Sequence, residues 1–124
     1  MKDYRRLEVW QLAHELTLAI YPLTDRFPKN EMFGLTSQIR RSSASIAANI
    51  AEGCGRTGNA ELHRFLQIAA GSASELDYHL LLARDLKYVA DQEYAVREAE
   101  LNRLRRKLTA LLSKVRQDRN APGN

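Results

Sequence analysis

Polar side chains recur along residues 38–52 at a spacing that places them in one narrow arc of a helix, at about 100° per residue. The row consists of Gln38, Ser42, Ser45, Asn49 and Glu52. It could hydrogen-bond a facing helix and so fix bundle register or a subunit contact, or it could bind a ligand. Polar residues between apolar stripes more often specify assembly, and a buried Glu52 would need a partner. We therefore favour the assembly role.

Basic residues form a second group with chemical potential. The chain has a net charge of +4, which favours anionic partners. The nucleic-acid-binding candidates are Arg103, Arg105, Arg106 and Lys107, together with Arg40, Arg41 and Arg56. If RNA or DNA binds, phosphate contacts should dominate and sequence preference should be poor. The alternative, which has equal support, is that these residues form an ordinary solvated helix face and bind no nucleic acid.

Catalytic and metal chemistry find little support in the sequence. Glu75 and His79 are one helical turn apart, but the chain has no Glu-x-x-His pair of the kind a di-iron bundle uses. The serines within 42–45 have no histidine near them in sequence, and the glycine-rich stretch 53–58 lacks the lysine of a phosphate-binding loop. Cys54 is the only cysteine, so an internal disulfide is excluded. We expect no enzyme activity, no metal and no cofactor.

Four segments of helical periodicity must position these residues. The first runs from about Leu7 to Arg26 and ends before Phe27-Pro28, with Pro22 expected to kink or loosen its last turns. The second begins with Thr36 or Ser37 as its cap and ends at 53–55. The third begins at Asn59 as a cap and the fourth at Asp91.

Apolar residues follow each helix at steps of three and four, which places them on one face. The inward positions are Val9, Ala13, Leu16, Ile20, Leu23 and Phe27; Ile39, Ser43, Ile46 and Ile50; Leu62, Phe65, Leu66, Ala69, Ala73, Leu76, Leu80 and Ala83, toward Leu86; and Leu101, Leu104, Leu108, Leu111 and Val115. Gly71 and Ser72 lie in mid-helix, where a small residue lets another backbone approach, so we add both to the assembly residues.

These segments predict an all-α fold, an antiparallel up-down four-helix bundle. We expect a single domain over 1–119 and a flexible tail over 120–124. No apolar stretch approaches the ~20 residues of a membrane-spanning helix, and residues 1–6 contain no signal-peptide block. We therefore expect a cytoplasmic protein that does not enter membranes.

The sequence resembles a bacterial four-helix-bundle family. The family includes the intervening-sequence proteins, encoded within insertions in large-subunit ribosomal RNA genes, and the accessory variability determinant of diversity-generating retroelements. The matching pieces are Leu7–Gln11, Ala13–Leu16, Phe27–Pro28 with Glu31, Gly34–Arg41, Ser45–Ile46, Asn49–Gly53, Arg64–Leu66, Gly71–Ser72 and Glu75–Leu76. The resemblance implies an antiparallel four-helix subunit of a ring-like homopentamer without known catalysis. In the retroelement branch it implies a reverse transcriptase and nucleic acid as partners.

Two functional hypotheses follow. One is a homo-oligomeric nucleic-acid-binding or polymerase-accessory protein that uses a basic surface. The other is an oligomeric scaffold or protein-interaction module with no nucleic-acid role.

Overall fold

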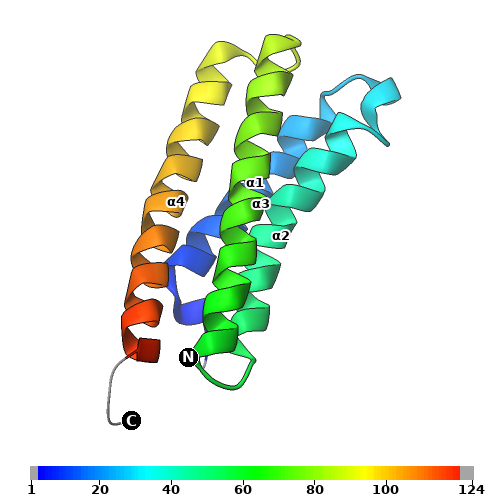
Figure 1. Cartoon of the computed structure of the whole chain (residues 1–124). Coiled ribbons are helices and arrows are strands. Elements are labelled where there is room, and N and C mark those ends of the chain that lie inside the picture. Colours follow the sequence, from blue (N-terminus) through cyan, green and yellow to red (C-terminus); the bar gives the residue numbers. More distant parts are fainter. Residues whose placement is uncertain (1–2, 121–124) are drawn as a thin grey trace.

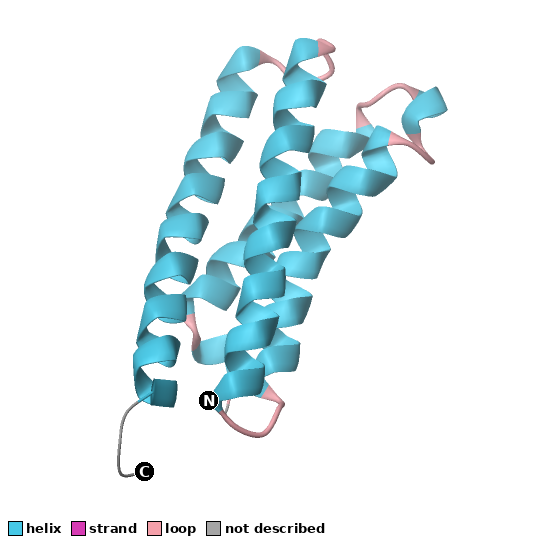
Figure 2. Cartoon of the chain, in the orientation of Figure 1, coloured by secondary structure: helices cyan, strands magenta, loops and turns pink. Residues whose placement is uncertain are grey.

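The regular structure is helical throughout the part of the chain that the computed structural model describes, which is the backbone of residues 3–120 and the side chains of residues 3–118 (Figure 2). The predicted all-α fold with four helices is confirmed. The helices are α1 (Glu8–Asp25), α2 (Leu35–Cys54), α3 (Asn59–Asp85) and α4 (Asp91–Asn120), with short 3-10 helices η1 (Tyr4–Arg6) and η2 (Lys29–Glu31) before α1 and α2.

The four helices lie side by side around one core (Figure 1). α1 packs on α2 and α4, and α3 packs on the same two helices. The start of α1, the turn between α2 and α3, and the last residues of α4 lie at one end of the bundle, and the other two connections lie at the opposite end (Figure 1). Asn120, expected to begin a tail, still belongs to α4, and residues 121–124 lie outside the described part.

The core is formed by the predicted seams. Every predicted inward residue of α1 and α2, and of α3 as far as Ala83, is buried, as are Leu101, Leu104, Leu108 and Val115. Leu111 is half-buried. The extension of the α3 seam to Leu86 is wrong, because this side chain is 45% exposed. α3 has already ended there, and the backbone turns at Lys87 with a φ of 68°.

The predicted helix caps are wrong for α2 and α3. α2 begins at Leu35, and the carboxylate of Glu31 accepts a hydrogen bond from the Leu35 N–H at 3.2 Å. α3 begins at Asn59, while Gly58 occupies the cap position with a φ of 87°, a conformation that glycine adopts without steric cost. In both cases a residue that precedes the helix, Glu31 or Gly58, sets its start, and the side-chain cap preference of Thr36, Ser37 and Asn59 does not.

Pro22 does not end α1, which continues to Asp25. Proline lacks the N–H that would bond the carbonyl four residues earlier, so the last turn needs other support. Thr24 donates its hydroxyl to the Ile20 carbonyl at 2.8 Å, and Arg40 reaches the same turn from α2. Of the described helices, none is both long and apolar enough to cross a membrane.

Candidate nucleic-acid and assembly surfaces

Arg103, Arg106 and Lys107 are exposed because the leucine seam of α4 faces the core and leaves the opposite side of the helix to solvent. Arg103 and Lys107, one turn apart, both reach Glu8 at the start of α1, at N–O distances of 3.1 and 3.2 Å. The Glu8 carboxylate therefore neutralises part of the charge of both residues. All three side chains are about half exposed, so these pairs add little to stability.

The next two basic residues face different directions. Arg105 turns toward α3, where it donates to Asp77 at 3.3 Å and to the Ser74 hydroxyl at 3.1 Å. Arg106 is exposed, and none of the described carboxylates lies within ion-pair distance of it. Of the four α4 residues predicted to bind nucleic acid, Arg106 alone is therefore uncompensated by a described carboxylate.

A polar row of α4 runs along the side that faces away from the bundle. Its members are exposed and recur at steps of four and three: Asn102, Arg106, Thr109, Ser113 and Arg116. Its first part contains a shallow hollow of about 370 Å³, lined by Asn102, Arg105, Arg106 and Thr109. Lys114 is also exposed, and Lys114 and Arg116 have no described carboxylate at ion-pair distance. We call Arg106, Lys114 and Arg116 the open basic residues of α4.

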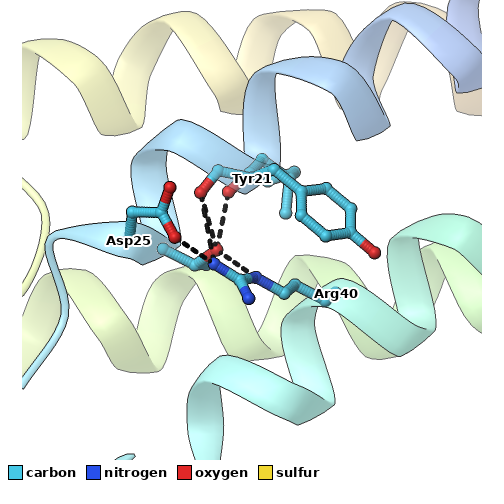
Figure 3. A network of polar contacts seen from close by, with 5 residues as sticks. Tyr21, Asp25 and Arg40 are labelled. Atoms are coloured by element: carbon cyan, nitrogen blue, oxygen red, sulfur yellow. Dashed lines mark hydrogen bonds and ion pairs between the residues drawn. The ribbon is translucent and has the colours of Figure 1, made fainter. Parts of the chain in front are cut away.

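Arg40 binds within the subunit, although it was predicted to contact nucleic acid. Its guanidinium donates to the Thr24 hydroxyl at 2.8 Å, to the Tyr21 carbonyl at 3.4 Å and to Asp25 at 2.7 Å (Figure 3). The guanidinium carbon also lies 4.8 Å from the centre of the Tyr21 ring. A cation that binds the last carbonyls of a helix favours its negative end. Arg40 therefore closes the C-terminal turn of α1 that Pro22 weakens.

Arg41 and Arg56 lie apart from α4 and from each other. Arg41 is exposed, with no described carboxylate at ion-pair distance. Arg56 follows the end of α2, 3.9 Å from Glu52, with its guanidinium carbon 5.0 Å from the centre of the Phe65 ring. The structure therefore distributes the seven predicted residues among α4, the first half of α2 and the α2–α3 turn.

Only the middle of the polar row on α2 faces α3. The hydroxyls of Ser45 and Ser72 lie 2.9 Å apart between the two helices, and Asn49 donates to the hydroxyl and carbonyl of Ser45 at 2.9 and 2.8 Å. Ser42 is buried but donates to the carbonyl of Gln38 in its own helix. Within the subunit, the row thus joins α2 to α3 through Ser45.

The two ends of the polar row are exposed. Gln38 and Glu52 lie at the surface, and the Glu52 side chain is 53% exposed. A second polar contact escaped the sequence reasoning: the hydroxyls of Thr17 and Ser43 meet at 2.9 Å between α1 and α2. The signal was present, because Ser43 is a polar residue within an apolar stripe.

Glycines 53 and 71 differ in their surroundings within the subunit. A Cβ added at Gly53 would lie 2.9 Å from the Cβ of Phe65 on α3, so Gly53, interpreted as part of a helix stop, permits the close approach of α2 and α3. A Cβ added at Gly71 would meet no described atom within 4 Å. Within the subunit, therefore, Gly71 is not the point of close approach, and its surface is open.

The described residues contain no group of three or more histidine, cysteine, aspartate or glutamate side chains that could hold a metal ion. Cys54 is buried, and this burial raises the pKa of its thiol. A protonated thiol is a poor nucleophile.

Comparison with known proteins agrees with the fold. The chain is similar to the crystal structure of a protein of unknown function from the S23 ribosomal protein family of Bacteroides thetaiotaomicron, with a TM-score of 0.79 and 25% sequence identity, covering 85% of this chain and 95% of that one. No curated protein matches the chain. The model of the 23S rRNA-intervening sequence protein family matches residues 5–110. The chain therefore belongs to the 23S rRNA-intervening sequence protein family.

Proposed function

We propose that this protein is a non-enzymatic nucleic-acid-binding protein that assembles into a ring-like homopentamer of antiparallel up-down subunits. The observation that carries the proposal is the set of open basic residues on α4. Arg106, Lys114 and Arg116 are exposed and have no described carboxylate at ion-pair distance. Uncompensated cations on a solvent-facing helix can neutralise phosphates and release the counterions that surround them.

The distribution of charge along α4 supports this proposal. After Glu100, the sequence of the helix contains Arg103, Arg105, Lys107 and Arg119 in addition to the open basic residues, while Asp118 is the only acidic residue in that stretch. In a homo-oligomer each copy would present the same surface, and several weak phosphate contacts would act together. Binding of this kind predicts low sequence preference, because phosphate contacts carry little sequence information.

The assembly part of the proposal depends on surfaces left uncovered within one subunit. Gly71 is open to solvent, and the large apolar side chains Ile68 and Tyr78 on the same helix are 39% and 59% exposed. Positions 68, 71, 75 and 78 recur at steps of three and four, so they share one side of α3. A second copy of the chain could cover this stripe, with Gly71 permitting close contact between backbones.

A scaffold without a nucleic-acid role is the second candidate, and the ion pairs of α4 favour it. Glu8 neutralises part of the charge of Arg103 and Lys107, and Asp77 does the same for Arg105. In this alternative the positive charge serves solubility, and the assembly presents its surfaces to another protein. A reverse transcriptase or another protein as partner, and a location in the cytoplasm, stay predictions.

Two measurements on the purified protein test the proposal. Light scattering at tens of micromolar protein should report a particle several times the 14.1 kDa subunit mass, five times for a pentamer. Gel-shift titration at low salt should show binding to mixed-sequence RNA or DNA. A monomeric particle would refute the assembly, and an absence of binding to both nucleic acids would leave the scaffold candidate.

A further inference from the structure

The connection between α1 and α2 presents an aromatic ring that the rest of the subunit leaves uncovered. Phe33 is 95% exposed and its neighbour Met32 is 55% exposed. Both follow η2 in the segment that projects from the end of the bundle (Figure 1). Because Phe33 contributes almost no burial, the fold does not account for a large apolar residue there. Exposed apolar surface of this kind marks interaction sites.

The projecting segment is held in place by Glu31. One oxygen of its carboxylate accepts from the Leu35 N–H at 3.2 Å, and the other accepts from the Tyr88 hydroxyl, beyond the end of α3, at 2.9 Å. A Cβ at Gly34 would lie 2.7 Å from the first of these oxygens, so glycine leaves room for the carboxylate. Glu31 thus ties the segment to α2 and to the α3–α4 connection, and Phe33 is presented from an anchored position.

Phe33 borders a hollow of about 400 Å³ between this segment, α1 and α2. That volume lies within the range of ligand sites, roughly 300–1,000 Å³. Its lining includes two aromatic rings, two guanidinium groups and three hydroxyls but no carboxylate; these groups belong to Tyr21, Phe33, Thr36, Ser37, Arg40 and Arg41. Arg40 is already bound to α1 and stacked on Tyr21 (Figure 3). Arg41 is exposed and has no described carboxylate at ion-pair distance.

We infer that this hollow binds single-stranded RNA or DNA, with an unpaired base stacked on Phe33 and a neighbouring phosphate bound by Arg41. Sites for single strands combine these two features: aromatic faces on which bases stack and cations that follow the backbone. The Ser37 hydroxyl at the rim adds a hydrogen-bonding group for phosphate or sugar. The inference rests on the proposed nucleic-acid-binding function and adds to it a preference for unpaired strands.

Base stacking on Phe33 gives this site a preference for unpaired strands that the open basic residues of α4 cannot provide. Bases in a duplex are already stacked and paired, so a duplex gains phosphate contacts but cannot use the ring. An acidic protein segment could pair with Arg41 as well. We favour nucleic acid because the lining offers ring faces and cations around an open hollow and not a deep apolar slot.

The test compares binding of 20-nucleotide uridine and thymidine single strands with binding of a duplex of the same length by fluorescence anisotropy. Phe33→Leu removes the ring face but keeps an apolar side chain, and the matched control Tyr78→Leu removes another exposed aromatic ring, on α3. We expect Phe33→Leu to weaken single-strand binding roughly 5- to 150-fold, the loss of one stacked base, and to leave duplex binding and the melting temperature unchanged. Tyr78 lies in the stripe proposed for assembly, so any effect of Tyr78→Leu should be equal for single strands and duplex and should be accompanied by a change of particle size in light scattering. Arg41→Gln should weaken binding of both and reduce the salt slope by about 1.

Three outcomes would overturn the inference. If Phe33→Leu binds single strands as tightly as wild type while substitution of the open basic residues of α4 weakens binding, the inferred single-strand site is wrong and the proposed function is retained. If wild type binds neither probe at low salt, both the single-strand site and the proposed nucleic-acid-binding function are wrong. If Phe33→Leu changes the oligomer size and leaves nucleic-acid affinity intact, a second copy of the protein covers the ring.

Discussion

Arg40 on α2 lies 2.7 Å from the carboxylate of Asp25 at the end of α1, and the same guanidinium holds the hydroxyl of Thr24. Because these contacts support the turn after Pro22, Arg40→Ala should lower the free energy of unfolding by about 1.5–3 kcal/mol, the range for hydrogen bonds of charged groups. Urea unfolding measures the change. Arg41→Ala is the matched control, since Arg41 is exposed, and it should change stability by less than about 0.5 kcal/mol. Equal losses in both variants would contradict the role of Arg40.

Gly53 and Gly71 should respond in opposite ways to the same substitution. Gly53→Ala should destabilise the subunit by about 1–3 kcal/mol through overpacking against Phe65. The higher helix propensity of alanine offsets up to about 1 kcal/mol of this loss. A Cβ added at Gly71 meets no described atom within 4 Å, so the propensity gain of Gly71→Ala should appear in full unless Gly71 faces another copy. Urea unfolding with light scattering separates the two cases. A smaller particle for Gly71→Ala would place Gly71 in the subunit contact, and a stabilised Gly53→Ala would refute the close approach.

The polar row on α2 predicts different costs at two neighbouring positions. Asn49 donates two hydrogen bonds to Ser45, so Asn49→Leu should cost about 0.5–1.5 kcal/mol or change the oligomer size. Glu52 is exposed and has only a distant ion pair with Arg56, so Glu52→Leu should leave the melting temperature of the subunit nearly unchanged. Thermal unfolding and light scattering of both variants provide the measurement. If Glu52→Leu lowered the melting temperature and Asn49→Leu did not, the row would stabilise the subunit through a contact other than the Asn49–Ser45 hydrogen bonds.

Tyr88 predicts how stability depends on alkaline pH. The hydrogen bond to Glu31 is the main cause that raises the pKa of the Tyr88 hydroxyl above its usual value near 10. A raised pKa in the folded state means that the stabilising contribution is complete below about pH 10 and is lost as pH rises through the folded pKa. Tyr88→Phe should therefore be less stable than wild type at pH 8, and the difference should shrink at higher pH. A difference that grows as pH rises above 10 would contradict this assignment.

Helices and core could be predicted because apolar spacing at three and four residues is a property of the sequence itself. Val9 through Leu23, Leu62 through Ala83 and the α4 leucines followed directly from that spacing. The starts of α2 and α3 could not be predicted in this way. The carboxylate of Glu31 and the positive φ of Gly58 lie outside the helices that they begin.

Partners across helices were the hardest part of the candidate site. The sequence places Arg103 and Lys107 on one side of α4, but Glu8, which lies 95 residues from Arg103, is brought to them only by the fold. In the sequence Arg40 cannot be distinguished from a surface arginine, and only the fold brings it to Thr24 and Asp25. Charge counted along a sequence therefore overstates the charge available to a partner.

A salt titration of nucleic-acid binding tests the central claim most directly. Wild type is compared with a variant in which the open basic residues Arg106, Lys114 and Arg116 are replaced by glutamine. The control replaces Arg103, Arg105 and Lys107, which are ion-paired, and so removes the same number of charges. Arginine, lysine and glutamine have similar helix propensities, so the fold should be retained.

Wild type should bind mixed-sequence RNA and duplex DNA at low salt, with log affinity falling linearly against log salt concentration. Replacing the open basic residues should lower the affinity more than the control does and should reduce the salt slope for duplex DNA by roughly 2–3, at about 0.9 for each lost phosphate contact. Equal loss in the two variants would mean that net charge alone drives binding. No binding by wild type at low salt would contradict the account and favour the scaffold.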